Sequence, residues 1–450
     1  MFTNSRILKI QFKLFLLFMG YTQLTYSQST NQDLDNQKLS IQQAINYSKQ
    51  NNKWVKIAQK EQIAVGHEKK DAVNAIFPQI NLGAGYQRFS DLTLFTDGLG
   101  GTVSGPRKPS PNGANLGIDA AFNLYSGGKS KAIIEEAKVK EELALLYLND
   151  QSGNIALQTV FQYLDLIRLT DLKRYLNDQM NRAQTRLKNI NSLYNNQKVT
   201  KSDVLRAEVM LSNVNLNIEQ VQNDIIITNQ KLGVLLDLKE NEIITPIDSA
   251  GMQKPILPSL DNLLNKYETS SYTIQRAGLN IQTQQAKLKG IRSNDMPSLY
   301  FTAAYNFTYP NYLFYPPVDQ MYSIGFVGLK MQYNVSSLYQ NKHKKSAASL
   351  RVEELKQQKE AVSDNVEQEI KSYYIKYGEA LNKISVNEKS IEQAKVNYKI
   401  VSTKYFNQLS LLTDLLDADN LLQESRFNLV RAQTEALLIY YKLQYSLGNL

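Results

Sequence analysis

Four segments of the chain alternate between apolar and polar residues, which is the pattern of a β-strand with two unlike faces. They cover residues 79–89, 114–125, 298–309 and 321–335. In the third segment Phe301 and Tyr305 fall on one face, while Thr302 falls on the other. The spacing therefore predicts two β-hairpins, 79–125 and 298–335, each with one apolar face and one mostly polar face.

The segments around these hairpins have the apolar period of amphipathic helices. The expected helices are 41–77, 129–195, 201–238, 259–295, 338–406 and 411–447. The two longest contain no proline, and a helix of nearly seventy residues is roughly 100 Å long. Such length favours helices packed side by side as in a coiled coil, with an ordinary buried helical bundle as the alternative.

The second half of the chain repeats the plan of the first half. The segment YNNQKVTKSDVLRAEVML, residues 194–211, aligns without a gap with YFNQLSLLTDLLDADNLL, residues 405–422. This indicates a tandem duplication of a unit of about 210 residues. The predicted organisation is a signal segment 1–27, a first repeat 28–245, a linker 246–258 and a second repeat 259–450.

The N-terminus has three basic residues, then a short apolar run at 14–19, then polar and small residues. This is the pattern of a secretory signal peptide, so residues 1–27 are excluded from the fold. The apolar run is too short to cross a bilayer, which takes about 20 apolar residues. The net charge is +9, and the basic residues are spread among acidic ones along the helices. Export and this mild, dispersed charge both argue against nucleic acid as a partner.

Strands of about ten residues that are apolar outside and polar inside are typical of outer-membrane barrels, although a soluble sandwich alternates as well. Four strands cannot close a barrel, and open edges cannot face lipid because their backbone groups would lack partners. The pattern therefore favours a place in the outer membrane, contact with outer-membrane lipid, and a barrel that several copies share.

The stretch YSGGKS, residues 125–130, ends like a phosphate-binding loop, but Asn123 stands where the first glycine is needed. We interpret it as a strand-to-helix turn in which Gly127 and Gly128 supply unusual backbone angles. The chain has no cysteine and two histidines, and no local motif combines a nucleophile with a base. We therefore expect no catalytic residue, no cofactor and no metal site, and do not expect an enzyme.

The order of elements, the duplication and three motifs resemble the TolC family of outer-membrane efflux channels. The motifs are FNLYSGGKSKA at 122–132, SDVLRA at 202–207 and TDLLDA at 413–418. The resemblance implies a mixed α and β membrane protein. Its homotrimer would form a twelve-stranded barrel, with four strands per chain, that continues into a long helical tunnel in the periplasm.

The resemblance also implies a function. The trimer would be the exit duct of a tripartite efflux system, which receives small molecules from an inner-membrane pump through a periplasmic adaptor. Two alternatives stay open. One is the exit duct of a type I protein-secretion system, and the other is a periplasmic coiled-coil scaffold or adaptor without a pore.

In this family, residues beside the two helix turns close the periplasmic end. The matching positions are Asp203, Asp414 and Asp417, with Tyr405 in the same turn. Capping of the helix N-termini explains Asp203 and Asp414 equally well, whereas Asp417 lies one turn further in. The arginine that latches some family members is replaced by Ser410.

The family's turn glycines are replaced by Gln197 and Gln408, although the neighbouring Asn196 and Asn407 tolerate a left-handed backbone. The resemblance places adaptor docking at these turns, on Val199, Thr200, Leu411 and Leu412. It places the hinges between strands and helices at Gly127, Gly128, Pro78 and Pro297. The long segments 91–113 and 310–320 are expected to face the outside of the cell.

Overall fold

The computed structural model describes residues 38–90, 94–95, 102–103, 110–239, 242–249, 255–311, 313 and 318–450. The expected signal peptide lies outside the described residues, and so do much of the segment 91–113 and parts of the linker and of the segment 310–320. Residues Leu39–Leu450 form one structural unit, which includes both of the expected repeats.

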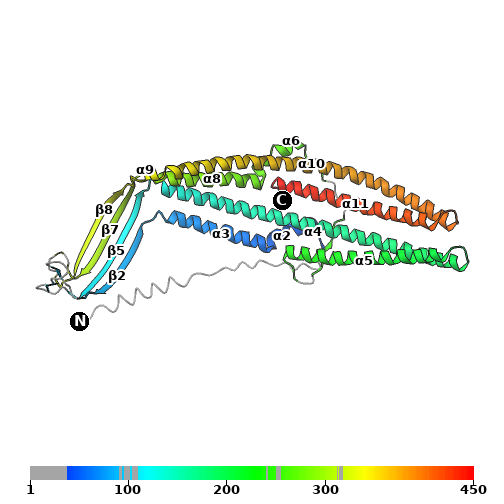
Figure 1. Ribbon diagram of the computed structural model, residues 1–450, viewed down its shortest axis with the longest axis horizontal. Helices are drawn as coiled ribbons and strands as arrows, with labels where there is room; N and C mark the ends of the chain where they lie inside the picture. Colours follow the sequence, from blue (N-terminus) through cyan, green and yellow to red (C-terminus); the bar gives the residue numbers. More distant parts are fainter. Residues whose placement is uncertain are drawn as a thin grey trace. The chain divides into compact units, whose positions relative to one another are not determined.

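Four antiparallel strands form one sheet in the order β2, β5, β7, β8 (Figure 1). They are β2 Gln79–Arg88, β5 Asn112–Tyr125, β7 Ser298–Tyr309 and β8 Tyr322–Gln332. Two short pairs add β1 Lys38–Leu39 with β6 Thr245–Pro246, and β3 Leu94–Phe95 with β4 Thr102–Val103. The β5–β7 pairing joins the two predicted hairpins, and β2 and β8 are the edges of the sheet.

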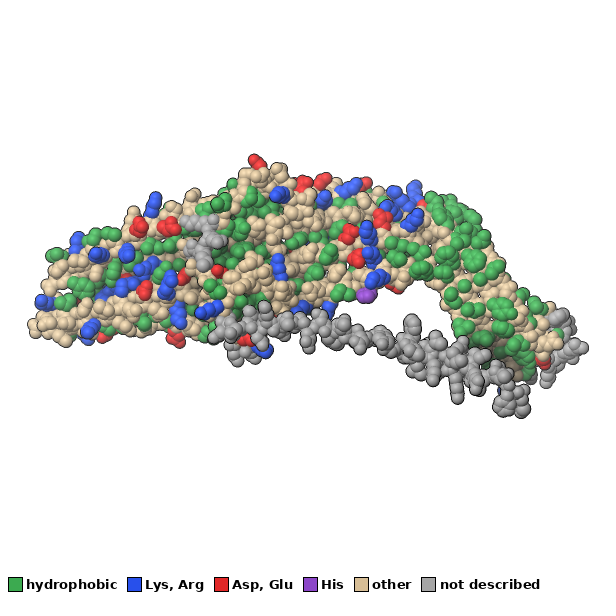
Figure 2. All heavy atoms as spheres, turned by 180° about the vertical axis from the view of Figure 1, so that it is seen from behind, with side chains coloured by type: hydrophobic (Ala, Val, Ile, Leu, Met, Phe, Trp, Pro, Cys, Tyr) green, Lys and Arg blue, Asp and Glu red, His purple; other side chains and the backbone are tan. Residues whose placement is uncertain are grey.

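The strand register gathers apolar side chains on one face of the sheet. Leu82 pairs with Ile118, which pairs in turn with Tyr305. The opposite face includes Asn81 and its cross-strand neighbour Asp119. Hydrophobic side chains gather over the strands, and most charged side chains lie over the helices (Figure 2). The alternation read from the sequence is therefore present in the sheet as two unlike faces.

The helices are α2 Ile41–Asn51, α3 Lys53–Asn74, α4 Lys129–Asn195, α5 Lys201–Leu236, α6 Leu260–Leu264, α7 Tyr267–Ser270, α8 Tyr272–Ser293, α9 Ser337–Gln340, α10 Lys342–Phe406 and α11 Leu412–Ser446. The long helices α4 and α10 have 67 and 65 residues. Within the described part of the chain, no helix has the length and apolarity that a membrane crossing requires.

The shorter helices differ from the sequence prediction. The segment expected as one helix over 41–77 is divided at Asn52, which is buried. Its side-chain oxygen accepts from the amide of Trp54 (2.9 Å), and its side-chain amide donates to the carbonyl of Leu235 in α5 (2.8 Å). The segment 259–295 is divided into α6, α7 and α8, with extended backbone at Ser271. The first break therefore depends on a contact between distant segments, which the apolar periodicity of the local sequence does not indicate.

Helix α4 has packing partners along its whole length. Near the sheet it packs against α3 and α8, and α8 packs against α10. Near the far turns it packs against α5 and α11, and α11 packs against α10. The order across the helices is thus α3, α4, α8, α10 at one end and α5, α4, α11, α10 at the other (Figure 1). Because α3 leads into β2 and β8 leads into α10, one flank consists of β2, α3 and α5, and the other of β8 and α10.

Candidate functional site

The two turns far from the sheet, between α4 and α5 and between α10 and α11, have the same backbone geometry. Gln197 (φ 58°) and Gln408 (φ 60°) take the left-handed conformation, while Asn196 and Asn407 do not. The amide after each glutamine donates to a carbonyl in the last helical turn, at 2.9 and 2.8 Å. This is a Schellman ending, which satisfies carbonyls at the helix C-terminus. The left-handed residue of each turn is therefore the glutamine and not the neighbouring asparagine.

Asp203 and Asp414 cap the helices that begin after these turns. The Asp203 carboxylate accepts from the amide of Thr200 (3.0 Å) and from its hydroxyl (2.7 Å), and the Thr200 hydroxyl accepts from the amide of Asp203 (3.3 Å). The Asp414 carboxylate accepts from the amide of Leu411 (3.0 Å). These bonds satisfy amides that the first helical turn leaves without partners. Capping accounts for the position of both carboxylates.

Asp417 lies three residues after Asp414 on α11, so the two side chains share a face of the helix. Both are exposed, and within the described residues the Asp417 carboxylate makes no hydrogen bond or ion pair. No capping bond accounts for it. Of the three aspartates, Asp417 is therefore the one whose position calls for another explanation, and its gate role stays a prediction.

Tyr405 lies in an apolar core that joins all four helices at this end. The buried members of this tip core are Ile190, Val204, Ala207, Tyr405, Leu412, Leu415 and Leu416. The Tyr405 hydroxyl makes no hydrogen bond within the described part of the chain. Burial raises the pKa of this hydroxyl, the nearby Asp203 carboxylate raises it further, and Arg186 opposes the shift. Tyr405 is thus a neutral core residue that packs one helical hairpin onto the other.

The four residues predicted to dock the adaptor have different environments. Leu412 is 4% exposed within the tip core, and Val199 is half-buried against it. Thr200 and Leu411 are exposed, and Leu411 is 70% exposed. Leu412 therefore holds the two helical hairpins together, and the docking role of all four residues stays a prediction. Leu411 offers an apolar side chain to a partner.

A buried charged cluster, which the sequence reasoning missed, ties α4 to α11 just beyond the tip core. The Asp419 carboxylate contacts Arg182 Nε (2.8 Å) and Arg186 Nη2 (2.6 Å). Arg182 also donates to Gln423 (3.4 Å) and lies over the ring of Tyr398 at 5.7 Å. Asp419 falls among buried apolar positions of α11, and a charge on the apolar face of a predicted helix was the available signal.

The stretch YSGGKS forms a tight turn between β5 and α4. Gly127 (φ 64°) and Gly128 (φ 91°) both have left-handed backbone. A Cβ on Gly127 would lie 2.5 Å from Met296 Cβ and 2.7 Å from the Ser293 carbonyl oxygen, whereas the space at Gly128 is open. The backbone therefore requires glycine most strictly at Gly127, and the interpretation of this stretch as a strand-to-helix turn is confirmed.

The two prolines predicted as hinges, Pro78 and Pro297, lie directly before β2 and β7. Beside the second, Asp295 connects the end of α8 to the start of α10. Its carboxylate contacts Lys345 Nζ (2.6 Å) and accepts from the side-chain amide of Asn341 (3.1 Å). These two hydrogen bonds, the one from Lys345 first, hold the pKa of Asp295 below its usual range. The hinge role of the two prolines stays a prediction.

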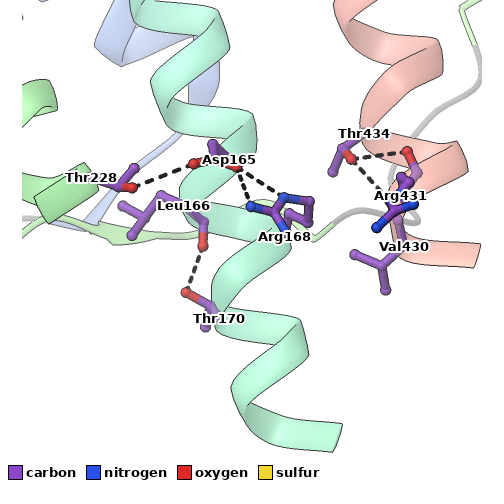
Figure 3. A network of polar contacts seen from close by, with 8 residues as sticks. All are labelled: Asp165, Leu166, Arg168, Thr170, Thr228, Val430, Arg431 and Thr434. Carbon is purple, nitrogen blue, oxygen red and sulfur yellow. Dashed lines mark hydrogen bonds and ion pairs between the residues drawn. The ribbon is translucent and has the colours of Figure 1, made fainter. Parts of the chain in front are cut away.

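A polar network lies midway along α4 (Figure 3). It lies beside a groove. The Asp165 carboxylate accepts from Arg168 (2.7 and 2.9 Å) and from the Thr228 hydroxyl of α5 (3.4 Å). The groove has a volume of about 280 Å³ between α4, α5 and α11, and Arg168 and Arg431 line it from opposite helices. Among the described residues, no group of three His, Cys, Asp or Glu could hold a metal ion. The network's evident role is to connect α5 to α4.

No protein-family model and no curated protein matches the sequence. Solved structures do match. The outer-membrane channel OprN has a TM-score of 0.78 and 16% identity, covering 92% of this chain and 94% of that one. The outer membrane protein VceC of Vibrio cholerae has a TM-score of 0.75 and 15% identity, covering 91% and 96%. CusC, whose structures concern transmembrane channel formation, has a TM-score of 0.78 and 14% identity, covering 93% of each chain. The chain has the fold of an outer-membrane channel.

At these identities the likeness concerns the fold, and this is the fold that the TolC-family resemblance implied. Because coverage exceeds nine tenths of both chains, the correspondence extends over the sheet, the long helices and the turns. The gate, docking and hinge residues are features of this chain's own side chains, and their roles stay predictions.

Proposed function

We propose that the protein is an outer-membrane exit duct of a tripartite efflux system. The observation that carries the proposal is a four-stranded sheet with one apolar face and, among the described residues, two edges without a strand partner; this sheet is continuous with helices far too long for a compact domain. The likeness to solved outer-membrane channels supports it. A duct works by shape, so this function needs no catalytic group, and energy would come from the pump.

The apolar face of the sheet suits a lipid environment. Three charged residues occur in the four strands, Arg88, Asp119 and Lys330. Asp119 and Lys330 alternate onto the polar face, and Arg88 lies at the strand end away from the helices. A sheet face whose one charge sits at its rim matches the lipid-facing band of an outer-membrane barrel.

The edges of the sheet imply an assembly. Within the described residues, β2 and β8 each have one strand partner, and unpaired backbone groups cannot face lipid. The flanking helices carry exposed apolar side chains as well: Leu205, Val209 and Leu216 on α5, and Val386, Val396 and Ile400 on α10. A rotation that brings the β2, α3 and α5 flank of one copy against the β8 and α10 flank of the next would cover both sets and close a ring.

The number of copies and the partners follow from the TolC-family resemblance. Three copies would give a twelve-stranded barrel, and their helices would enclose the periplasmic tunnel. The turns at Gln197 and Gln408 would meet the periplasmic adaptor, with Asp417 at the closed end. The proposed cargo is small molecules that an inner-membrane pump delivers.

Fractionation and electrophoresis test this function. The protein should occur in outer-membrane extracts as a trimer band in SDS that converts to a monomer band on heating. A chain found in the soluble periplasmic fraction as a monomer would favour a coiled-coil scaffold without a pore and would refute the duct.

A further inference from the structure

We propose that β8 of one copy pairs with β2 of the next copy in one particular register, in which Lys330 lies opposite Asn81 and reaches Asp119 of that next copy. The inference rests on the proposed function, because it assumes a barrel closed by several copies. A second copy of this chain would pair with the exposed edges of the sheet. The register follows from the pairing inside the sheet, from the ends of the strands and from the charges on the polar face.

The pairing inside the sheet shows how far the two edges are displaced along the strand direction. Following cross-strand partners from Gln79, the first residue of β2, leads to Gly328 of β8. Strand β8 continues to Gln332, four residues further toward the helices. At the other end, partners of Tyr322, the first residue of β8, lead back to Gly85, and β2 continues to Arg88. Both ends therefore show a displacement of three to four residues.

This displacement is what tilted strands in a closed barrel require. Four residues are about 13 Å along a strand, and the three strand spacings from β2 to β8 are about 14 Å across, which corresponds to a tilt of about 40°. That value lies within the range found in barrels. A rotation about the barrel axis keeps β2 of every copy at the same height along that axis. Strand β2 of the next copy therefore covers the same height along the barrel axis as β8. Matching their ends places Gln79 opposite Gln332 and Arg88 opposite Ser323.

In the half of the strands nearer the helices, the matched register pairs apolar residues with apolar residues on the apolar face. On the apolar face it places Leu82 opposite Leu329 and Ala84 opposite Val327. A slip of one residue would turn the apolar residues of β2 to the polar face, so only shifts by an even number of residues compete. Shifts by two residues in either direction would place Lys330 opposite Gln79 or Gly83 instead of Asn81.

The charges on the polar face favour the register that places Lys330 opposite Asn81. Within one chain, the cross-strand partners of Asp119 lead to Phe326, so Lys330 lies two strands and four residues away, about 16 Å between Cα atoms. Lys330 makes no ion pair within the described residues. The Asp119 carboxylate accepts from the side-chain amide of Asn81 (3.0 Å). Lys330 opposite Asn81 would be about 10 Å from Asp119 between Cα atoms, a span that the two side chains cover.

Disulfide trapping tests the register directly, because the chain contains no cysteine. Asn81→Cys combined with Lys330→Cys should give disulfide-linked dimers and trimers under mild oxidation. The matched controls combine Asn81→Cys with Gly328→Cys or with Gln332→Cys, which report the two neighbouring registers. More efficient linkage in either control would overturn the proposed register while leaving the assembly intact. Monomers in every variant and in the wild type would instead contradict the proposed function.

A charge exchange tests the role of the ion pair. Asp119→Lys and Lys330→Asp should each lower the temperature at which the SDS-resistant trimer dissociates, since each leaves two like charges at the seam. The double variant should recover at least half of the combined loss. If the losses add in the double variant, Lys330 and Asp119 do not meet, and the charge argument for the register fails. Lys330→Met, which removes the charge without reversing it, should have a smaller effect than Lys330→Asp.

Discussion

Removing the charge of Asp419 would test whether the buried cluster holds α4 against α11. Asp419→Asn keeps the shape of the side chain but leaves Arg182 and Arg186 side by side without a counter-charge. The side chains of Arg186 and Asp419 are 5% and 3% exposed, so solvent screens this repulsion weakly. Breaking a buried pair by removing one partner costs about 3–5 kcal/mol. We expect about 3 kcal/mol, because asparagine still accepts a hydrogen bond.

Hydrogen–deuterium exchange of the purified protein measures this loss locally. If the helices open more easily at the cluster, amides in 179–190 and 415–425 should exchange roughly 100-fold faster, since each 1.4 kcal/mol changes an equilibrium tenfold. Amides in the sheet should keep their rates. Unchanged exchange in both helical segments would show that the cluster does not hold these helices together.

Two controls separate the buried cluster from ordinary surface charge. Glu379→Gln removes an exposed ion pair with Lys383, whose partners are 58% and 50% exposed, and should leave exchange unchanged. Replacing the cluster by Arg182→Met, Arg186→Met and Asp419→Leu together should restore slow exchange, because apolar groups of similar volume replace a buried ionic network without loss. Fast exchange in this triple variant would mean that the hydrogen bonds of the cluster itself, and not only the absence of uncompensated charge, hold these helices together.

Three further predictions concern the turns and the closed end. Gly127→Ala should lower the dissociation temperature of the trimer more than Gly128→Ala. Both variants acquire a left-handed backbone strain of roughly 1–2 kcal/mol, but only the Cβ at position 127 would lie close to Met296 and Ser293. Equal shifts of the dissociation temperature would contradict this. Asp414→Asn combined with Asp417→Asn should abolish cation selectivity in a planar bilayer with a salt gradient. Asp417→Asn alone should produce most of the change, because Asp414 is engaged as a cap. An unchanged reversal potential in the double variant would leave capping as the full account of both residues. Leu411→Asp should reduce export at a normal trimer level, whereas Leu412→Asp should reduce the trimer itself, because it places a charge in the tip core.

The sequence predicted the elements that have strong local signals. Alternation located each of the four long strands, β2, β5, β7 and β8, within three residues of its observed bounds, and the glycines at 127–128 together with the turn at 196–200 bounded α4. The break at Asn52 was not predicted, because it depends on a hydrogen bond to Leu235, far along the chain. A local sequence pattern indicates which structure a segment favours by itself, whereas the break at Asn52 depends on a contact with a distant helix.

The candidate site likewise contains features that the local sequence predicted and features that it did not. Asp203 and Asp414 could be read as caps because capping acts within one turn, and the structure contains those bonds. The contact of Arg186 with Asp419 joins residues 233 positions apart, so no local spacing indicates it. The burial of Leu412 is equally a property of four helices meeting.

Conductance of the purified trimer in a planar bilayer tests the central claim most directly. If the sheets of the copies close a barrel that continues into a helical tunnel, inserted trimers should produce discrete, stepwise ionic currents. Trimers whose insertion is established by protection from protease, yet which carry no current at any applied voltage, would contradict the account of this protein as a duct.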